Sequence, residues 1–272
     1  MRWISYLEGG PKRVNHAAVS VGHKIYSFGG YCTGENSREY ASMDVHVLNT
    51  TTFRWTKHPV SDLPYFENDD ILPYKRPSGP EPTFRDFHTA VCIKDKMYVF
   101  GGRGTVFLNR GETQEAYCNE LWYLDLKTFV WHNVLVNGNI PIGRRSHSAF
   151  MYNEKMYIFG GYNSVLGQHL NDMYEFTPET NTWRKIDCPG EKPCERRRQA
   201  CVLVGHKVFF FGGTSPQQQP RKASIQTEDV DDKLIDHSDM YILDFRPSLK
   251  TLCIIAVRKH KQDESILPHS IK

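Results

Sequence analysis

The sequence predicts an all-β protein built from four-stranded units, and three observations carry that prediction. A glycine pair follows a short aromatic-rich run at four places, in "KIYSFGG", "KMYVFGG", "KMYIFGG" and "KVFFFGG". These runs are short and bounded by turn residues, as expected for strands that are buried on both faces. Before residue 247, no segment keeps an apolar stripe over three helical turns. Four copies of one pattern indicate a repeat protein rather than an unrelated β-sandwich.

Fixed distances around each glycine pair define the repeat. A histidine or glutamine stands thirteen residues before the first glycine, and an arginine stands three residues before that. The arginines are Arg13, Arg85, Arg144 and Arg196, and the histidine positions are His16, His88, His147 and Gln199. Because the histidines recur on schedule, we expect them to be structural.

Each unit is predicted to contain four short strands. The first follows the histidine, and a turn such as "YNEK" leads from it into the aromatic-rich run. A polar loop leads to a third segment such as "NELWYLD", and a tryptophan marks the fourth strand in "FRWTK", "FVWHN" and "NTWRK". The glycine pair permits positive φ and close backbone approach where the second strand ends.

The fourth repeat supplies three strands, and its missing strand is predicted at the N-terminus. A tryptophan precedes a glycine by seven residues at three places: Trp3–Gly10, Trp131–Gly138 and Trp183–Gly190. We therefore expect Met1–Leu7 to complete the last unit and close a ring, which removes an exposed sheet edge. Residues 1–246 then form one domain, and residues 247–272 form a separate tail.

One junction departs from the regular spacing. From Trp55 to His88 is 33 residues, whereas the two later gaps of this kind are 16. The Pro-x-x-Arg motif that precedes repeats two to four also occurs at Pro73–Arg76, with no strand pattern behind it. We favour the loss of repeats near Arg76; a polar loop insertion is the alternative.

The four-stranded unit of roughly 50 residues resembles the kelch repeat, which builds β-propellers. The stretches "VNHAAVSVGHKIYSFGGYC", "GRRSHSAF" and "DHSDMYILDFRPSLKTLC" resemble the Peas type of kelch domain-containing proteins. That family has six repeats, so the resemblance implies a kelch β-propeller shortened by two repeats. It also implies a substrate-recognition subunit of a cullin–RING ubiquitin ligase, of the cullin-two type, that binds protein C-termini ending in glycine.

The tail contains two segments that are similar to the ligase-binding boxes of such receptors. Leu249, Cys253 and Val257 are spaced four apart and form one apolar stripe if a helix begins after Pro247. This stripe is similar to the box that binds elongin C; the alternative is a terminal strand, because "CIIAV" is rich in β-branched residues. "LPHSI" is similar to the start of a cullin-selecting box, with the candidate residues Leu267, Pro268 and Ile271.

Arginines just before the first strand of each repeat are expected at one mouth of the propeller. They would form a basic pocket for a terminal carboxylate, which a guanidinium holds with two hydrogen bonds. The candidates outside the repeating pattern are Arg145, Ser146, Arg197 and Arg198. The repeating arginines Arg13, Arg85, Arg144 and Arg196 are candidates too, although such residues also tie parts of a blade together.

Composition gives little support to other classes of function. The formal charge is +3 from 34 Lys and Arg against 31 Asp and Glu, too balanced for a general nucleic-acid binder. Seven cysteines without a CxxC pair fit free thiols in a reducing compartment and no metal site. No HExxH, GxSxG or phosphate-loop motif is present, so we expect no enzymatic activity and no cofactor.

No segment approaches the length of a membrane span, and the first residues do not form a signal peptide. The expected location is therefore the cytoplasm, with the nucleus as a further possibility. The rival functions are a kelch scaffold outside any ligase, a chromatin-associated interaction protein, and an inert shortened isoform.

Overall fold

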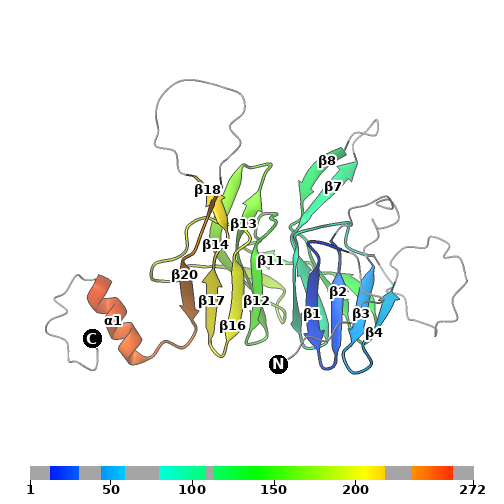
Figure 1. Ribbon diagram of the computed structural model, residues 1–272, viewed down its shortest axis with the longest axis horizontal. Coiled ribbons are helices and arrows are strands. Elements are labelled where there is room, and N and C mark those ends of the chain that lie inside the picture. The colour runs from blue at the N-terminus through cyan, green and yellow to red at the C-terminus, as the bar shows by residue number, and fades with distance from the viewer. Residues whose placement is uncertain (1–12, 31–43, 59–79, 108–112, 218–233, 260–272) are drawn as a thin grey trace, which may run out of the picture.

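Four sheets form four blades in the computed structural model, which describes residues 13–30, 44–58, 80–107, 113–217 and 234–259 (Figure 1). All strand pairs in the blades are antiparallel except β11–β15 in blade 3. Blade 1 contains β1 (Ala17–Val21), β2 (Lys24–Phe28), β3 (Val45–Asn49) and β4 (Arg54–His58). Blade 2 contains β5 (Thr89–Ile93), β6 (Lys96–Phe100), β9 (Leu121–Asp125) and β10 (Val130–Asn133). Blade 3 contains β12 (Ser148–Tyr152), β13 (Lys155–Asn163), β14 (Gln168–Thr177), β15 (Thr182–Ile186) and the short β11 (Asn137–Gly138). Blade 4 contains β16 (Ala200–Val204), β17 (Lys207–Phe211) and β20 (Met240–Asp244).

Two hairpins and one helix complete the described elements. Strands β7 (Arg103–Phe107) and β8 (Thr113–Tyr117) extend blade 2 upward in Figure 1, and β18 (Thr214–Pro216) pairs with β19 (Leu234–Asp236) above blade 4. Helix α1 (Leu249–Lys259) follows the last strand. The backbone amide of Thr251 donates to Ser248 Oγ at 3.1 Å, so Ser248 caps the helix. The helical prediction for this part of the tail is confirmed, and the alternative of a terminal strand is wrong.

A two-residue turn joins the first two strands of each blade, and its first residue, Gly22, Lys94, Asn153 or Gly205, has positive φ. In blade 3, Tyr152 pairs with Lys155 across a two-residue turn, and Asn153 and Glu154 have φ of 48° and 57°. Positive φ at both central residues is typical of the tight turns whose twist matches that of paired strands. The "YNEK" turn is therefore where the sequence predicts it.

Three hydrophobic cores hold neighbouring blades together, and a repeated aromatic pair lies in two of them. Phe28 of blade 1 packs on Trp131 of blade 2 with ring centroids 4.7 Å apart, and Phe100 packs on Trp183 of blade 3 at 5.2 Å. Both tryptophans are 1% exposed. The tryptophan of each fourth strand thus seals the blade against the preceding one, which explains why it recurs.

The glycine pair permits the next blade to approach closely. Gly101 has φ of 71°, and a side chain there would come within 2.7 Å of the Arg144 carbonyl and of the His147 ring. His147 in turn meets Phe100 edge to face, with ring centroids 5.7 Å apart. His147 and His88 are both 5% exposed, and burial lowers the pKa of His88 to about 3. The buried, neutral rings agree with a structural role.

Blade 4 has three strands within the described residues, and its outer edge is open. In blade 3, Gly138 is packed so closely that a side chain would collide with the Trp183 carbonyl of the fourth strand. The equivalent Gly190 has nothing within 4 Å of such a side chain. A cavity of about 540 Å³ lies beside it, lined also by Tyr241 and Leu243. The predicted closing strand, Met1–Leu7, lies outside the described residues.

The face of blade 4 that would contact a following blade is also exposed. Val202, Val204 and Met240 are 48%, 61% and 59% exposed. Their counterparts in blade 2 are Val91, Ile93 and Leu121, which are 6%, 3% and 0% exposed because blade 3 covers them. Blades 1 and 4 extend in opposite directions in Figure 1, and no hydrophobic core among the described residues joins them. The four blades are therefore spaced as members of a larger ring.

Candidate functional site: an arginine and aromatic cluster where the blades converge

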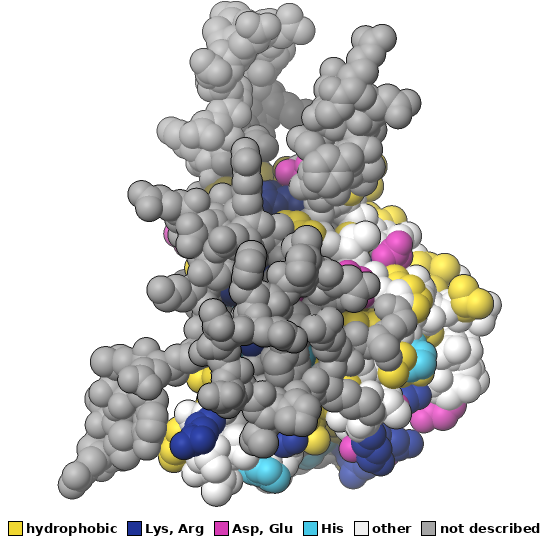
Figure 2. All heavy atoms as spheres, turned by 90° about the vertical axis from the view of Figure 1, so that its right-hand side faces the viewer, with side chains coloured by type: hydrophobic (Ala, Val, Ile, Leu, Met, Phe, Trp, Pro, Cys, Tyr) yellow, Lys and Arg dark blue, Asp and Glu magenta, His cyan; other side chains and the backbone are white. Residues whose placement is uncertain are grey.

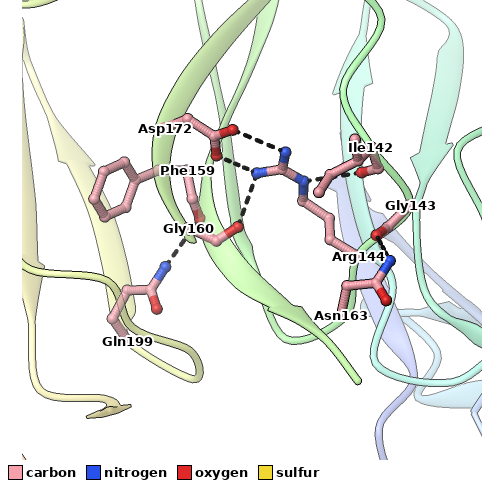
Figure 3. Close-up of polar contacts among 8 residues, drawn as sticks. All are labelled: Ile142, Gly143, Arg144, Phe159, Gly160, Asn163, Asp172 and Gln199. Carbon is pink, nitrogen blue, oxygen red and sulfur yellow. Dashed lines mark hydrogen bonds and ion pairs between the residues drawn. The ribbon is translucent and has the colours of Figure 1, made fainter. Parts of the chain in front are cut away.

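The repeating arginines are buried clamps inside the blades. Arg144 binds Asp172 with two hydrogen bonds, of 2.6 and 3.2 Å, and also donates to the Gly160 carbonyl at 3.1 Å (Figure 3). Its Nε donates to the Ile142 carbonyl at 3.1 Å. The residue is 0% exposed, so its charge is compensated entirely from within the blade.

The same clamp recurs in the other blades. Arg196 binds Asp239 at 2.5 and 2.8 Å, and Arg85 lies 3.4 Å from Glu120. Both donate to the first carbonyl of the glycine pair, and both side chains are at most 1% exposed. In blade 1, Arg13 lies 3.9 Å from Asp44 and its side chain is 3% exposed. This geometry gives Arg13, Arg85, Arg144 and Arg196 a structural role, and we do not retain them as ligand-binding candidates.

The residue just before each histidine position forms an inner backbone ladder that joins the blades. These residues are Asn15, Phe87, Ser146 and Arg198, with φ between 54° and 62°. The amide of Phe87 donates to Asn15 O at 3.1 Å, that of Ser146 to Phe87 O at 2.9 Å, and that of Arg198 to Ser146 O at 2.8 Å. The ladder brings one residue of each blade to a common centre.

Three of the non-repeating arginines gather at this centre on an aromatic floor. Arg145 lies over the Phe87 and Tyr162 rings, at 5.5 Å from each centroid. Arg197 lies 4.5 Å from the Tyr162 centroid, and Arg198 lies 5.7 Å from that of Phe87. Cations at these distances are attracted to the ring faces. The structure therefore brings Arg145, Arg197 and Arg198 together and places Ser146 in the adjoining backbone; we call these four residues with Phe87, Tyr117 and Tyr162 the central cluster.

The cationic groups of the central cluster are not neutralised by neighbours. Within the described part of the chain, no carboxylate lies within ion-pair distance of Arg145, Arg197 or Arg198. Burial lowers the pKa of Arg197, and the charges of Arg198 and Arg145 lower it further. Nε of Arg145 and Nε of Arg197 are buried without a hydrogen-bond acceptor in that same part. Buried cationic donors that lie together without an acceptor are typical of an anion-binding site.

A polar contact between two blades borders the central cluster. Tyr117 on β8 donates to Glu115, and the Ser164 hydroxyl donates to the same carboxylate at 2.7 Å. Ser164 belongs to the turn between β13 and β14 of blade 3. Burial raises the pKa of Glu115, but these hydrogen bonds and the Arg145 charge outweigh it, so the pKa is lowered overall. Glu115 is therefore an anionic neighbour, and the three positive charges of Arg145, Arg197 and Arg198 exceed its single negative charge.

Sequence reasoning missed the aromatic floor. Phe87 occupies the repeat position of Ser146 and Arg198, and Tyr162 directly follows a glycine pair, so the repeat register could have indicated both. Tyr117 lies on the β7–β8 hairpin, which has no counterpart in the repeat pattern. No regular spacing could have placed it.

The candidate partner-binding residues lie partly on α1. Leu249 is 77% exposed, whereas Cys253 and Val257 are half-buried on the same helix. Leu252, which the apolar stripe does not include, is 48% exposed. The remaining candidates, Leu267, Pro268 and Ile271, lie outside the described residues.

Other features of the surface add no second site of the same kind. On the coloured part of the face in Figure 2, Lys and Arg side chains lie among Asp and Glu side chains rather than in a patch of one sign. Among the residues that the structure describes, no group of three His, Cys, Asp or Glu side chains is placed to hold a metal ion. No helix in those ranges is long and apolar enough to cross a membrane.

The blades, the glycine pairs and the buried tryptophans define a kelch-repeat β-propeller. A family model described as the KLHDC2/KLHL20/DRC7 Kelch-repeats domain matches residues 72–213, and a Kelch motif model matches residues 12–62. The chain therefore belongs to the kelch-repeat family.

Within this family the chain is similar to Kelch domain-containing protein 3. The proteins of this name from Homo sapiens and Bos taurus are each 37% identical to it over 368 aligned positions, which cover 100% of this chain and 94% of the relative. Because the chain has only 272 residues, about 96 of those positions have no counterpart in it. That length equals about two kelch repeats, which confirms the prediction of a chain shortened by two repeats.

More distant matches agree with the fold. Host cell factor 2 from Homo sapiens is 27% identical over 75% of this chain and 24% of its own length. Among solved structures, one titled "Structure of YjhT" has a TM-score of 0.53 and 20% identity, and covers 76% of this chain and 60% of that one. At that identity the likeness concerns the fold alone.

Proposed function

We propose that this propeller is the substrate-recognition subunit of a cullin–RING ubiquitin ligase and binds protein C-termini that end in glycine. It is a binding module and not an enzyme, and it needs no cofactor. The observation that carries the proposal is the central cluster, where three guanidiniums lie together without an acidic partner among the described residues. A terminal carboxylate is planar and forked, and a guanidinium matches it with two hydrogen bonds.

The position of the cluster supports a peptide end as the ligand. The inner ladder holds Phe87, Ser146 and Arg198 at the centre of the blades, beside the guanidiniums that would bind the terminal carboxylate. The aromatic floor would pack against the backbone of the last residues. A terminal glycine leaves room for this approach because it has no side chain.

Capture of free carboxylates tests the first half of the proposal. The purified chain should bind a peptide ending in Arg-Gly and should not bind the same peptide with an amidated end. Arg197→Gln and Arg145→Gln should each weaken binding by about 1.5–3 kcal/mol, the usual value of a hydrogen bond to a charged group. Arg54→Gln, at an exposed position on β4, is the matched control and should bind as the wild type does. Equal binding of acid and amide by a folded protein would contradict the proposal.

The second half of the proposal places elongin B/C and the cullin at the tail. Its support is an exposed helix that follows the last blade, on which Leu249, Cys253 and Val257 recur every four residues. An apolar stripe of this kind fits a groove on a partner. The complex would act in the cytoplasm, with the nucleus as the second location.

Co-purification tests the ligase connection. The chain should retain elongin B/C, and Leu249→Ala combined with Cys253→Ala should lose it while peptide binding is unchanged. Lys250→Ala, exposed on the same helix, should retain elongin. If the wild-type chain binds peptides but never elongin, the scaffold alternative stands.

A further inference from the structure

Blade 4 departs from the repeat in the contacts of its buried arginine. Two residues before that arginine, blade 2 has Thr83 and blade 3 has Ile142, and in both blades the arginine Nε donates to the carbonyl of that residue at 3.1 Å. Blade 4 has Cys194 at this position. There Arg196 donates from Nη2 to Cys194 Sγ at 3.2 Å, and its Nε is buried without an acceptor among the described residues. The thiol thus takes the place of the Thr83 hydroxyl, to which Arg85 Nη2 donates at 3.3 Å in blade 2.

An imidazole lies beside the same thiol. His237 Nε2 is 3.6 Å from Cys194 Sγ and 2.7 Å from Ser215 Oγ. Ser215 lies on β18 and His237 directly follows β19, so this hairpin brings both side chains to the loop that precedes β16. Arg196 is fixed in turn by Asp239. The repeat pattern requires neither the cysteine nor the histidine.

This environment is one that activates a cysteine. A guanidinium within hydrogen-bond distance stabilises the thiolate, and a neighbouring imidazole accepts the thiol proton. Three other described cysteines are in the opposite situation: burial raises the pKa of Cys201 to about 12 and also raises the pKa values of Cys92 and Cys188.

The thiol is also within reach of small molecules. Cys194 is half-buried, and its neighbour Pro193 lines the cavity of about 540 Å³ between blades 3 and 4. Gly190 and Tyr241 line the same cavity.

We propose that Cys194 is a modification site for small, soft electrophiles, with Arg196 as the stabilising cation and His237 as the proton acceptor. In the reaction with iodoacetamide, Sγ forms a bond to the methylene carbon, the carbon–iodine bond breaks and iodide leaves. The thiol proton passes to His237 Nε2. The adduct is a neutral thioether, a weaker acceptor for Arg196 than the thiolate, so modification affects the clamp of blade 4 directly.

The experiment compares alkylation rates of individual cysteines in the full folded chain. Limiting iodoacetamide is added near neutral pH, and each cysteine peptide is quantified by mass spectrometry over time. Cys194 should react about ten times faster than Cys118, because the Arg196 guanidinium lies within hydrogen-bond distance of its sulfur and His237 lies beside it to accept the proton. His237→Gln should slow Cys194 severalfold and leave Cys118 unchanged, and Ser215→Ala should not slow it.

Two results would overturn the proposal. One is that Cys194 reacts no faster than Cys118 in a protein whose Cys201 remains unlabelled, which shows that the chain is folded. The other is that the rate at Cys194 in wild type depends on pH as an ordinary thiol does. If His237→Gln unfolds the chain, Cys201 becomes labelled as well, and the wild-type dependence of rate on pH then decides.

Discussion

At the scale of single residues, two adjacent arginines, Arg144 and Arg145, have opposite roles. Arg144 is 0% exposed and its guanidinium is held by Asp172 and two carbonyls, whereas Arg145 is half-buried over aromatic rings with an unused Nε. The sequence "GRRSH" shows two adjacent arginines and cannot distinguish them. Only the side of the backbone to which each side chain turns separates the clamp from the ligand candidate.

Removal of the clamp carboxylate should be costly. Asp172→Ala leaves the buried Arg144 charge without its partner, and the free energy of unfolding should fall by about 3–5 kcal/mol. Urea unfolding measures this. The control is Lys127→Gln, which breaks an ion pair whose side chains are 74% and 48% exposed and should cost at most about 1 kcal/mol. Equal effects of the two changes would show that the clamp contributes no more than a surface pair.

The buried histidines should make the fold sensitive to acid. Burial lowers the pKa of His88 to about 3 in the folded state, below its ordinary value of 6.5, so the unfolded chain binds the proton first. Stability should therefore fall as the pH drops below about 6.5, with a slope of up to about 1.4 kcal/mol per pH unit from this residue. His88→Gln should flatten the curve of stability against pH, and blade 4 already has Gln199 at the same position, donating to the Phe159 carbonyl at 3.0 Å. An unchanged slope in this variant would contradict the assignment.

At the scale of elements, the fourth strands of blades 2 and 3 each carry a buried tryptophan. Phe28 and Phe100 meet Trp131 and Trp183 of the following blade. Phe159 is the third member of this series and packs on Phe210 at 5.0 Å, and the corresponding tryptophan of blade 4 is predicted to be Trp3.

Deletion of Met1–Leu7 should therefore destabilise the chain, by the loss of a buried aromatic side chain and a strand. Trp3→Ala alone should cost about 3–5 kcal/mol, the range found when a core tryptophan is truncated. Thermal unfolding of both variants tests this, and Trp183→Ala gives the reference for a tryptophan in a described fourth strand. If Trp3→Ala is as stable as the wild type, the N-terminal segment does not complete blade 4.

At the scale of the whole molecule, the four blades form a series, and the face of blade 4 that points away from blade 3 is exposed among the described residues. Val202→Thr combined with Val204→Thr should change the free energy of unfolding by less than about 1 kcal/mol, because water already reaches these side chains.

The matched control lies in blade 2. Val91→Thr combined with Ile93→Thr places hydroxyls in the core between blades 2 and 3 and should cost about 2–6 kcal/mol, since each buried unpaired hydroxyl costs about 1–3 kcal/mol. Denaturant unfolding of the two double variants gives the comparison. Similar losses in both would mean that blade 4 is covered in solution.

Much of this architecture could be predicted from the repeat, and the rest depends on contacts between distant segments. The strands, the turn at Asn153–Glu154 and the structural histidines follow from spacing that is repeated four times. The aromatic floor under Arg145 does not, because Phe87, Tyr117 and Tyr162 come from three different elements. The environment of Cys194 could not be predicted from the sequence either, because His237 lies 43 residues away along the chain.

In the inner ladder, backbone groups hold the blades together, whereas the side chains are the groups that a ligand would meet. Its hydrogen bonds use only backbone groups, so the fold is indifferent to whether the side chain at that step is that of Asn15, Phe87, Ser146 or Arg198. Each blade thus has one position whose side chain can change without a change in these backbone hydrogen bonds. With four such positions, recognition specificity could change by one substitution at a time.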